Sequence, residues 1–273
     1  MPELPEVETT RRGIDPWVCG KIVSSLQVRE ARLRWPVAPG IAAQVAGQRI
    51  LCTERRAKYL FLVFAHGRLM LHLGMSGSLR VLPAGQDEVL RKHDHVEWLL
   101  DDDTRLRFHD PRRFGSLHWL SGREPDHPLL NRLGPEPLSD HFDGDYLYGL
   151  ASGRRSNVKS FLMDQQVVVG VGNIYASEAL FMAGIHPARA AGRLSRARYQ
   201  RLSECVKIVL GQAIAQGGTT LRDFVNGNGQ PGYFQQSLLV YNREGLPCRQ
   251  CGAAIRQRRL AQRASYYCAH CQT

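Results

Sequence analysis

Four of the seven cysteines form two pairs near the end of the chain, and they constrain the fold more than any other feature. The pairs are CRQC at 248–251 and CAHC at 268–271, with sixteen residues between them. This spacing is typical of a tetrahedral zinc site with four thiolate ligands. Because four thiolates leave no open coordination position, we expect one structural Zn²⁺ that stabilises a segment too small for its own core. The expected ligands are Cys248, Cys251, Cys268 and Cys271.

The other three cysteines, Cys19, Cys52 and Cys205, are isolated in the sequence. An odd total in a reducing compartment argues against a disulfide framework. No apolar run reaches the length of a membrane span, and no signal peptide is recognisable. We therefore expect a cytoplasmic protein with no membrane partner.

The chain is strongly basic, with 36 Lys and Arg against 25 Asp and Glu and a net charge of +11. This surplus suits a polyanionic partner such as nucleic acid, and an ordinary basic enzyme is the alternative. The segment GAAIRQRRLAQRASYY between the cysteine pairs is rich in arginine and predicts a β-hairpin. Short zinc modules of this kind commonly bind nucleic acid through phosphates or bases.

The first 130 residues have the pattern of a strand-rich domain. Short apolar runs with aromatic and β-branched members occur at 58–64, 68–73, 96–100 and 105–109, and DDDT between the last two predicts a hairpin. Strands at this spacing are typical of a sandwich or barrel. An early helix is expected in ETTRRGIDPWV.

The pattern becomes helical after a segment rich in Pro, Gly and Asp at 134–144, where we expect a domain boundary. Apolar residues between 199 and 214 recur with the period of a helix, and Ser195 is the candidate N-cap of that helix. Residues 173–187 predict another helix. The glycine-rich stretch 219–234 predicts a long loop, and such loops are often functional.

Two tight loops carry side chains suited to probing DNA. LGMSGSL at 73–79 has Met75 between glycines, and HDPRRFG at 109–115 has Arg112 and Phe114. Proteins that kink duplex DNA insert Met, Phe or Leu between base steps. An adjacent arginine can hydrogen-bond the partner of an extruded base. Ordinary loop residues are the alternative.

The sequence GVGNIYASEALF places glycines and Asn173 where a helix begins. Helix N-termini and exposed glycine backbone bind phosphate, so this start is a candidate phosphate contact. The alternative is a core helix with an asparagine cap.

The chain begins MPELPEVETT, and removal of the methionine would leave Pro2 with a free secondary amine beside Glu3. Such a start raises the question of whether the chain terminus takes part in chemistry. A solvated, frayed start is the alternative.

Taken together, these motifs resemble the bacterial formamidopyrimidine-DNA glycosylase family. The resemblance covers the whole chain and is carried by MPELPEVET, RRAKYL, HLGMSGSL, KHDHV, DPRRFG, LGPEPL, VVGVGNIYASE, GIHP, QGGTTLRDF, GQPGYF and the terminal AQRASYYC. The related endonuclease VIII typically begins PEGPE and prefers oxidised pyrimidines, so Leu4 favours the purine enzyme. The resemblance implies a bifunctional enzyme that excises 8-oxoguanine and formamidopyrimidines from duplex DNA and then cleaves the abasic site by β,δ-elimination.

The resemblance also implies the fold, an α+β multidomain protein that acts as a monomer. The expected domains are an N-terminal catalytic β-sandwich at 1–131, a helical domain with a helix–two-turn–helix motif at 132–236, and a zinc finger hairpin at 237–273. DNA is expected between the two main domains.

Residue roles follow by the same resemblance. Pro2 is the expected nucleophile, Glu3 the general acid or base, and Glu6 either a supporting residue or part of a structural salt bridge. Lys58 is an expected catalytic lysine, with a plain phosphate contact as the alternative, and the 219–234 loop caps the extruded base. The remaining expectations are that Arg263 grips phosphates at the lesion and assists δ-elimination, that Asn173, His93, Arg112 and Arg155 contact DNA, and that Met75, Arg112 and Phe114 fill the gap left by the flipped nucleotide.

Two other functions remain open from the residues alone. A non-catalytic protein that bends DNA would need the zinc module and Asn173 but neither Pro2 nor Glu3. An abasic-site lyase without base excision lies between these two possibilities.

Overall fold

The computed structural model describes residues 2–86, 88–122, 127–218 and 237–273. The chain divides into two compact units: unit 1 comprises residues 1–128 with 216–235, and unit 2 comprises residues 129–215 with 236–273. Across the described ranges, no helix has the length and apolar character needed to cross a membrane.

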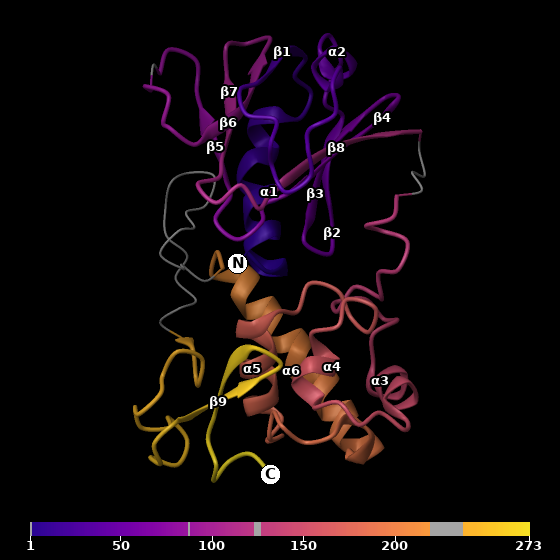
Figure 1. Ribbon diagram of the computed structural model, residues 1–273, viewed down its shortest axis with the longest axis vertical. Helices are drawn as coiled ribbons and strands as arrows, with labels where there is room; N and C mark the ends of the chain where they lie inside the picture. Colours follow the sequence, from indigo (N-terminus) through magenta and orange to yellow (C-terminus); the bar gives the residue numbers. More distant parts are fainter. Residues whose placement is uncertain (1, 87, 123–126, 219–236) are drawn as a thin grey trace. The chain divides into compact units, whose positions relative to one another are not determined.

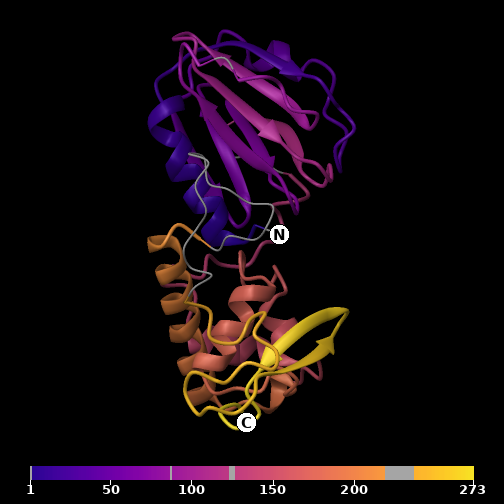
Figure 2. The ribbon, with the colours of Figure 1, turned by 90° about the vertical axis from the view of Figure 1, so that its left-hand side faces the viewer.

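Unit 1 contains two four-stranded antiparallel sheets, with strand orders β1-β6-β7-β5 and β2-β3-β4-β8 (Figures 1 and 2). Its elements are α1 (Leu4–Val18), β1 (Val23–Val28), α2 (Ile41–Val45), β2 (Cys52–Arg56), β3 (Tyr59–Phe64), β4 (Gly67–His72), β5 (Ser78–Leu82), β6 (Asp94–Leu100), β7 (Arg105–His109) and β8 (Ser116–Ser121).

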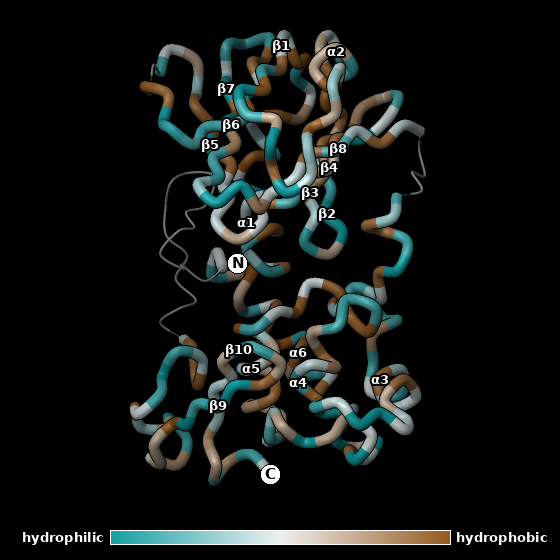
Figure 3. The backbone as a smooth tube through the Cα atoms, in the orientation of Figure 1, coloured by the Kyte–Doolittle hydropathy of each residue, from teal (hydrophilic) through white to brown (hydrophobic). Residues whose placement is uncertain are grey.

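The two sheets share one hydrophobic core. Leu60 and Leu62 of β3 lie in this core with Val96 and Trp98 of β6, because alternate strand residues point to the same face. The mixture of apolar and polar residues along the strands is visible in Figure 3. The expected β-sandwich is therefore confirmed, and the predicted hairpin across DDDT is the β6–β7 pair.

Helix α1 begins four residues earlier than the segment ETTRRGIDPWV predicts. Glu3 is its N-cap and forms a capping box with Glu6, and a proline occupies the first turn. Val7 and Ile14 then bury one face of the helix in the sandwich core. The start of the chain is thus part of the folded domain.

Unit 2 is helical and carries a C-terminal hairpin. Its elements are α3 (Gly144–Ala151), α4 (Val158–Leu162), α5 (Asn173–Met182), η1 (Ala191–Arg193), α6 (Arg196–Ala215), β9 (Arg256–Leu260) and β10 (Arg263–Tyr267). Tyr199, Leu202, Val206 and Leu210 of α6 are buried, as the helical period predicts. Figure 3 shows the hydrophilic character of β9.

The zinc module completes its small core with a residue of α5. Phe181 of that helix packs with Val240, Ile255, Cys248 and Cys268. This agrees with the expectation that the cysteine segment is too small for a core of its own.

Acidification is expected to destabilise unit 1 through His72. Burial, followed by the positive charges of Lys58 and Arg34, lowers the pKa of His72 from 6.5 to about 4. The Gly74 N–H donates to Nδ1 of His72 at 3.0 Å, so the structure accommodates an unprotonated Nδ1. The unfolded chain binds a proton at this imidazole more tightly than the folded chain does. The contribution of neutral His72 to the free energy of unfolding is therefore complete above about pH 6.5 and is lost as the pH falls toward 4.

The substitution His72→Asn removes this titration and keeps an acceptor for the Gly74 N–H. Between about pH 7.5 and about pH 5, the wild type should lose about 2 kcal/mol more unfolding free energy than the variant. Urea unfolding followed by tryptophan fluorescence measures this, since all four tryptophans belong to unit 1. His66→Asn, at an exposed turn, is the control. Equal pH dependence of His72→Asn and wild type would contradict the assignment.

Candidate functional site

The N-terminal residues Pro2 and Glu3 are buried rather than solvated. The backbone N–H of Glu3 donates to Oε2 of Glu6 at 2.8 Å, which fixes the peptide that follows Pro2. Gly218 also approaches Glu6: a Cβ at Gly218 would lie 3.1 Å from Oε1, and its φ is +81°. The hydrogen bond between Glu3 and Glu6 therefore fixes the start of α1, and the Gly218 backbone lies close to the Glu6 side chain.

Lys58 lies at the tight turn between β2 and β3. Ala57, the preceding residue, has a φ of 55° in this turn. The Lys58 side chain is almost completely buried, at 4% exposure, and its charge contributes to the low pKa of His72. A buried ammonium is unusual for a simple surface phosphate contact.

The two probe loops pack directly against each other. Asp110 accepts from the Ser76 hydroxyl at 2.9 Å and from the Gly115 N–H at 2.8 Å, so one carboxylate joins both loops. A Cβ at Gly74, where φ is +65°, would lie 2.4 Å from the carbonyl carbon of Phe114. Only glycine permits this approach.

The side chains at the tips of these loops remain accessible. Met75 is 39% exposed and Phe114 is 38% exposed, although both are large apolar residues. The Arg112 guanidinium lies 4.8 Å from the centre of the Phe114 ring. The structure thus brings the three expected gap-filling residues onto adjoining loops, with apolar surface available to a partner.

His93 lies beside the second loop. Its carbonyl accepts the Asp110 N–H at 3.0 Å, and its ring is 5.9 Å from that of His109 and 6.0 Å from that of His95. Partial burial, followed by His109 and His95, lowers the pKa of His93. A neutral imidazole can donate one hydrogen bond to a phosphate oxygen.

Asn173 and the zinc hairpin meet within unit 2. Asn173 is the first residue of α5, and its Nδ2 donates to the Ala264 carbonyl at 3.1 Å. The Asn173 Oδ1 is buried and has no hydrogen-bond partner in the described protein. Arg263, next to Ala264, is exposed at the start of β10, and Arg155 is exposed in the segment between α3 and α4.

Lys159 of α4 is a further residue that the sequence analysis did not single out. It is buried, and its Nζ donates to the Ala264 carbonyl at 3.1 Å and to the Ser265 hydroxyl at 2.9 Å. It therefore fixes the hairpin beside Arg263. No local signal distinguishes it, because a lysine on a short helix normally lies in solvent.

Glu178 of α5 is the second such residue. Its carboxylate accepts the N–H groups of Leu239, Val240 and Tyr241 at 2.7, 3.0 and 2.8 Å. Burial raises the pKa of Glu178, and these three N–H groups oppose that rise. The carboxylate thus attaches residues 239–241, just before the first cysteine pair, to the helix that begins at Asn173.

The four paired cysteines form the cluster that their spacing predicts. All four Sγ atoms lie within 4.8 Å of one another, with 3.9 Å between Cys248 and Cys271 and 3.4 Å between Cys251 and Cys268. Tetrahedral zinc with bonds of about 2.3 Å places its sulfur ligands about 3.8 Å apart. The donor set therefore fits one structural zinc.

Burial raises the pKa of the Cys268 thiol, but the N–H groups of Cys271 and His270, together with the side chains of Cys251 and Cys271, lower it to about 7. A thiolate is the form that binds zinc.

The candidate residues fall into two sets. Pro2, Glu3, Lys58 and the loops with Met75, His93, Arg112 and Phe114 belong to unit 1. Asn173, Arg155, Arg263 and the zinc ligands belong to unit 2. The expected base-capping loop at 219–234 lies outside the described residues.

Known protein families match three consecutive parts of the chain. The formamidopyrimidine-DNA glycosylase N-terminal domain matches residues 1–117, and the formamidopyrimidine-DNA glycosylase H2TH domain matches residues 133–225. A zinc finger found in FPG and IleRS matches residues 245–273. The order of these domains agrees with the sandwich, helical unit and cysteine cluster described above.

Individual relatives match over the full length. A formamidopyrimidine-DNA glycosylase of Stenotrophomonas maltophilia (strain R551-3) is 61% identical over 272 residues, and one of Alkalilimnicola ehrlichii is 58% identical over 276 residues, with 100% of each chain covered. The crystal structure of MutM (Fpg) from Thermus thermophilus has a TM-score of 0.88 at 39% identity, covering 99% of this chain and 98% of that one. A complex of a Lactococcus lactis Fpg mutant with DNA containing Fapy-dG has a TM-score of 0.89 at 30% identity, with 100% of both chains covered.

The fold, the four-cysteine zinc finger and these full-length matches agree, and we conclude that the chain belongs to the formamidopyrimidine-DNA glycosylase family.

Proposed function

We propose that this enzyme excises oxidised purines, 8-oxoguanine and formamidopyrimidines, from duplex DNA and then cleaves the strand at the abasic site. The observation that carries the proposal is that Pro2 and Glu3 are buried at the chain start of a member of this family. The Glu3 N–H, in the peptide that joins the two residues, donates to Oε2 of Glu6 at 2.8 Å. Complexes of Lactococcus lactis Fpg with Fapy-dG DNA and with abasic-site DNA support the substrate class.

Pro2 is the proposed nucleophile once Met1 has been removed. An α-amino group has a pKa near 8, against about 10.4 for lysine, so more of it is unprotonated at neutral pH. Its nitrogen forms a bond to C1′ while the glycosidic bond breaks and the base leaves. Opening of the sugar ring then gives an iminium, a Schiff base, between Pro2 and C1′.

The iminium permits strand cleavage because it acidifies C2′. Loss of the C2′ proton expels the 3′ phosphate, and a second elimination expels the 5′ phosphate. The proposed product is a gap of a single nucleotide with phosphates at both ends. Arg263 is proposed to grip the lesion phosphates and to assist the second elimination, and Lys58 to act near the damaged base or the 5′ phosphate.

Glu3 is the proposed general acid and base. It is buried at the N-terminus of α1, next to the nucleophile in sequence. In this position it can protonate the sugar ring oxygen or the leaving base.

The remaining residues are proposed to bind DNA. Met75, Arg112 and Phe114 fill the gap left by the flipped nucleotide, which their adjoining loops and exposed tips support. His93, Arg155 and Asn173 contact the backbone. We further propose a cytoplasmic monomer with domains at 1–131, 132–236 and 237–273.

Duplexes labelled at either end and containing 8-oxoguanine opposite cytosine test this function. We expect cleavage products with phosphates on both sides of the gap, visible by gel mobility. Cleavage of only a preformed abasic site would instead identify a lyase without base excision. Tight binding without cleavage of either duplex would identify a non-catalytic DNA-binding protein.

A further inference from the structure

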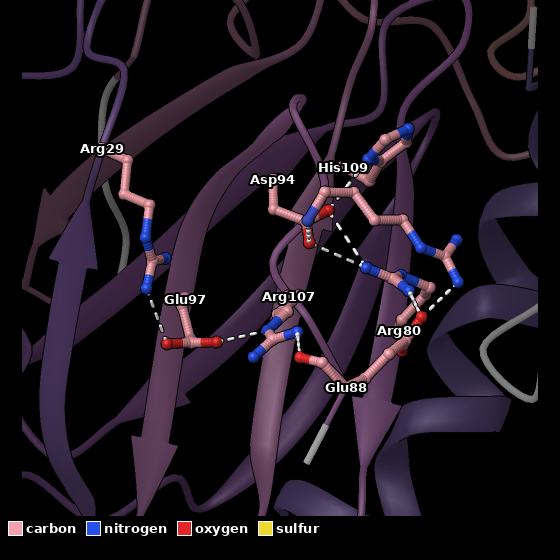
Figure 4. Close-up of polar contacts among 8 residues, drawn as sticks. Arg29, Arg80, Glu88, Asp94, Glu97, Arg107 and His109 are labelled. Atoms are coloured by element: carbon pink, nitrogen blue, oxygen red, sulfur yellow. Dashed lines mark hydrogen bonds and ion pairs between the residues drawn. The ribbon is translucent and has the colours of Figure 1, made fainter.

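One sheet of the sandwich carries a continuous series of charged side chains. Figure 4 shows Glu97 between Arg29 and Arg107, while the Arg107 guanidinium also reaches the Glu88 carbonyl at 2.8 Å. Arg80 lies next along the sheet, on β5. Glu97, Arg107 and Arg80 lie on β6, β7 and β5, Arg29 directly follows the end of β1, and Glu88 lies in the segment between β5 and β6.

Arg80 is the residue of this series with the most direct link to that segment. Its Nη2 donates to both carboxylate oxygens of Asp94, at 3.1 and 2.9 Å, and its Nη1 donates to Glu88 at 2.7 Å. The side chain of Arg80 is only 9% exposed, and that of Asp94 is fully buried. A planar guanidinium that engages two carboxylates at once holds them in a defined geometry.

The Arg80 contacts fix both ends of residues 88–94. Asp94 also accepts the Arg91 N–H at 3.0 Å and contacts Nδ1 of His109 at 2.9 Å. Glu88 additionally pairs with the Arg91 side chain. Between these attached residues, Val89 is 86% exposed, so the segment is held by its polar groups and not by apolar packing.

His93 occupies the last position before Asp94 in this attached segment. Its carbonyl is held by the Asp110 N–H, and its neighbour Asp94 is held by Arg80. His93 therefore lies between Arg91 and Asp94, which are joined by the Asp94 carboxylate that Arg80 also engages. Buried ion pairs add little net stability over apolar residues of similar volume, whereas a guanidinium that donates to both oxygens of a carboxylate has a defined geometry.

We propose that Arg80 is a positioning residue for the DNA contact at His93, an inference that rests on the DNA-binding role proposed above for His93. Arg80 acts through Asp94 and Glu88, which set the path of residues 88–94. The contact would lie beside the loop that carries Arg112 and Phe114, since Asp110 joins His93 to that loop.

A double-mutant cycle with the full-length zinc-loaded protein tests the proposal. The probe is a duplex with a stable abasic-site analogue, and the readout is the dissociation constant by fluorescence anisotropy at fixed salt. His93→Ala should weaken binding by about tenfold. Arg80→Met should weaken it more than Arg68→Met, a control that removes the same charge from an ion pair with Glu54 on the other sheet.

In the His93→Ala background, Arg80→Met and Arg68→Met should bind equally, within about twofold. If the dissociation constant of the double variant rises by the product of the two single fold-changes, Arg80 and His93 act independently. That result would overturn the positioning role while leaving the His93 contact intact. No effect of His93→Ala alone would refute the contact itself, and the positioning role with it.

A milder pair of variants serves if Arg80→Met does not fold. Glu88→Gln removes the charge that Arg80 engages at the start of the segment but leaves the buried Arg80–Asp94 pair at its end, and Glu54→Gln is its control with the same charge change. Glu88→Gln should weaken binding relative to Glu54→Gln only when His93 is present. An equal effect with and without His93 would overturn the proposal.

Discussion

Glu3→Gln is expected to slow base excision by about a thousandfold while DNA binding stays within a few-fold of wild type. Glutamine keeps a side-chain oxygen for the N-cap of α1 but cannot deliver or take the proton that the leaving base requires. Cleavage of a preformed abasic site should persist, because no base has to leave. Single-turnover assays on duplexes with 8-oxoguanine and with an abasic site measure the two steps separately.

The control for this variant is Glu54→Gln, which makes the same chemical change on β2, where Glu54 pairs with Arg68. It should excise 8-oxoguanine at the wild-type rate. Undiminished excision by Glu3→Gln would remove Glu3 from the acid and base role. Equal loss of excision and abasic cleavage would instead place Glu3 in both steps.

Removal of zinc, by a chelator or by Cys248→Ser, is expected to lower DNA affinity by about a hundredfold or more without unfolding unit 1. The small core around Cys248 and Cys268 depends on the metal, whose binding contributes about 10 kcal/mol in comparable modules. Without it the hairpin loses its contacts to Lys159 and Asn173, and Arg263 loses its position. Fluorescence anisotropy with labelled duplex measures the affinity.

Tryptophan fluorescence reports on unit 1 in the same samples, because residues 17, 35, 98 and 119 are the only tryptophans. Its urea midpoint should stay unchanged on zinc removal. Cys205→Ser, which changes a buried cysteine of α6 outside the cluster, should keep full affinity. Loss of the unit 1 transition together with zinc would contradict an independent zinc module.

Local sequence patterns predicted the helices and strands that the periodicity of their own residues determines. The apolar runs at 58–64 and 68–73 are β3 and β4, and the period after Ser195 is α6. The cysteine spacing predicted the metal cluster for the same reason, since two short knuckles fix most of the ligand geometry.

Contacts between distant residues were beyond such patterns. Lys159 meets Ala264 across 105 positions of the chain, and Asp110 reaches Ser76 across 34. Arg80 and Asp94 look like ordinary surface charges until the strand order places them together. Neither residue type nor spacing marks these side chains, because their environment exists only in the folded chain.

The family resemblance went further than the patterns, and the family itself is confirmed over the full length. The catalytic roles of Pro2 and Glu3 and the domain limits near 131 and 236 stay predictions. The catalytic roles concern a reaction with DNA, and the domain limit near 236 falls at the end of residues 219–236, which lie outside the described residues.

Borohydride trapping on a duplex with 8-oxoguanine opposite cytosine tests the central claim most directly. The reductant converts the iminium to a stable amine, and mass spectrometry of the cross-linked peptide identifies the attached residue. The account predicts an adduct on the nitrogen of Pro2. Absence of any adduct, with tight binding retained and Met1 removed, would contradict the catalytic account and leave a DNA-binding protein in its place.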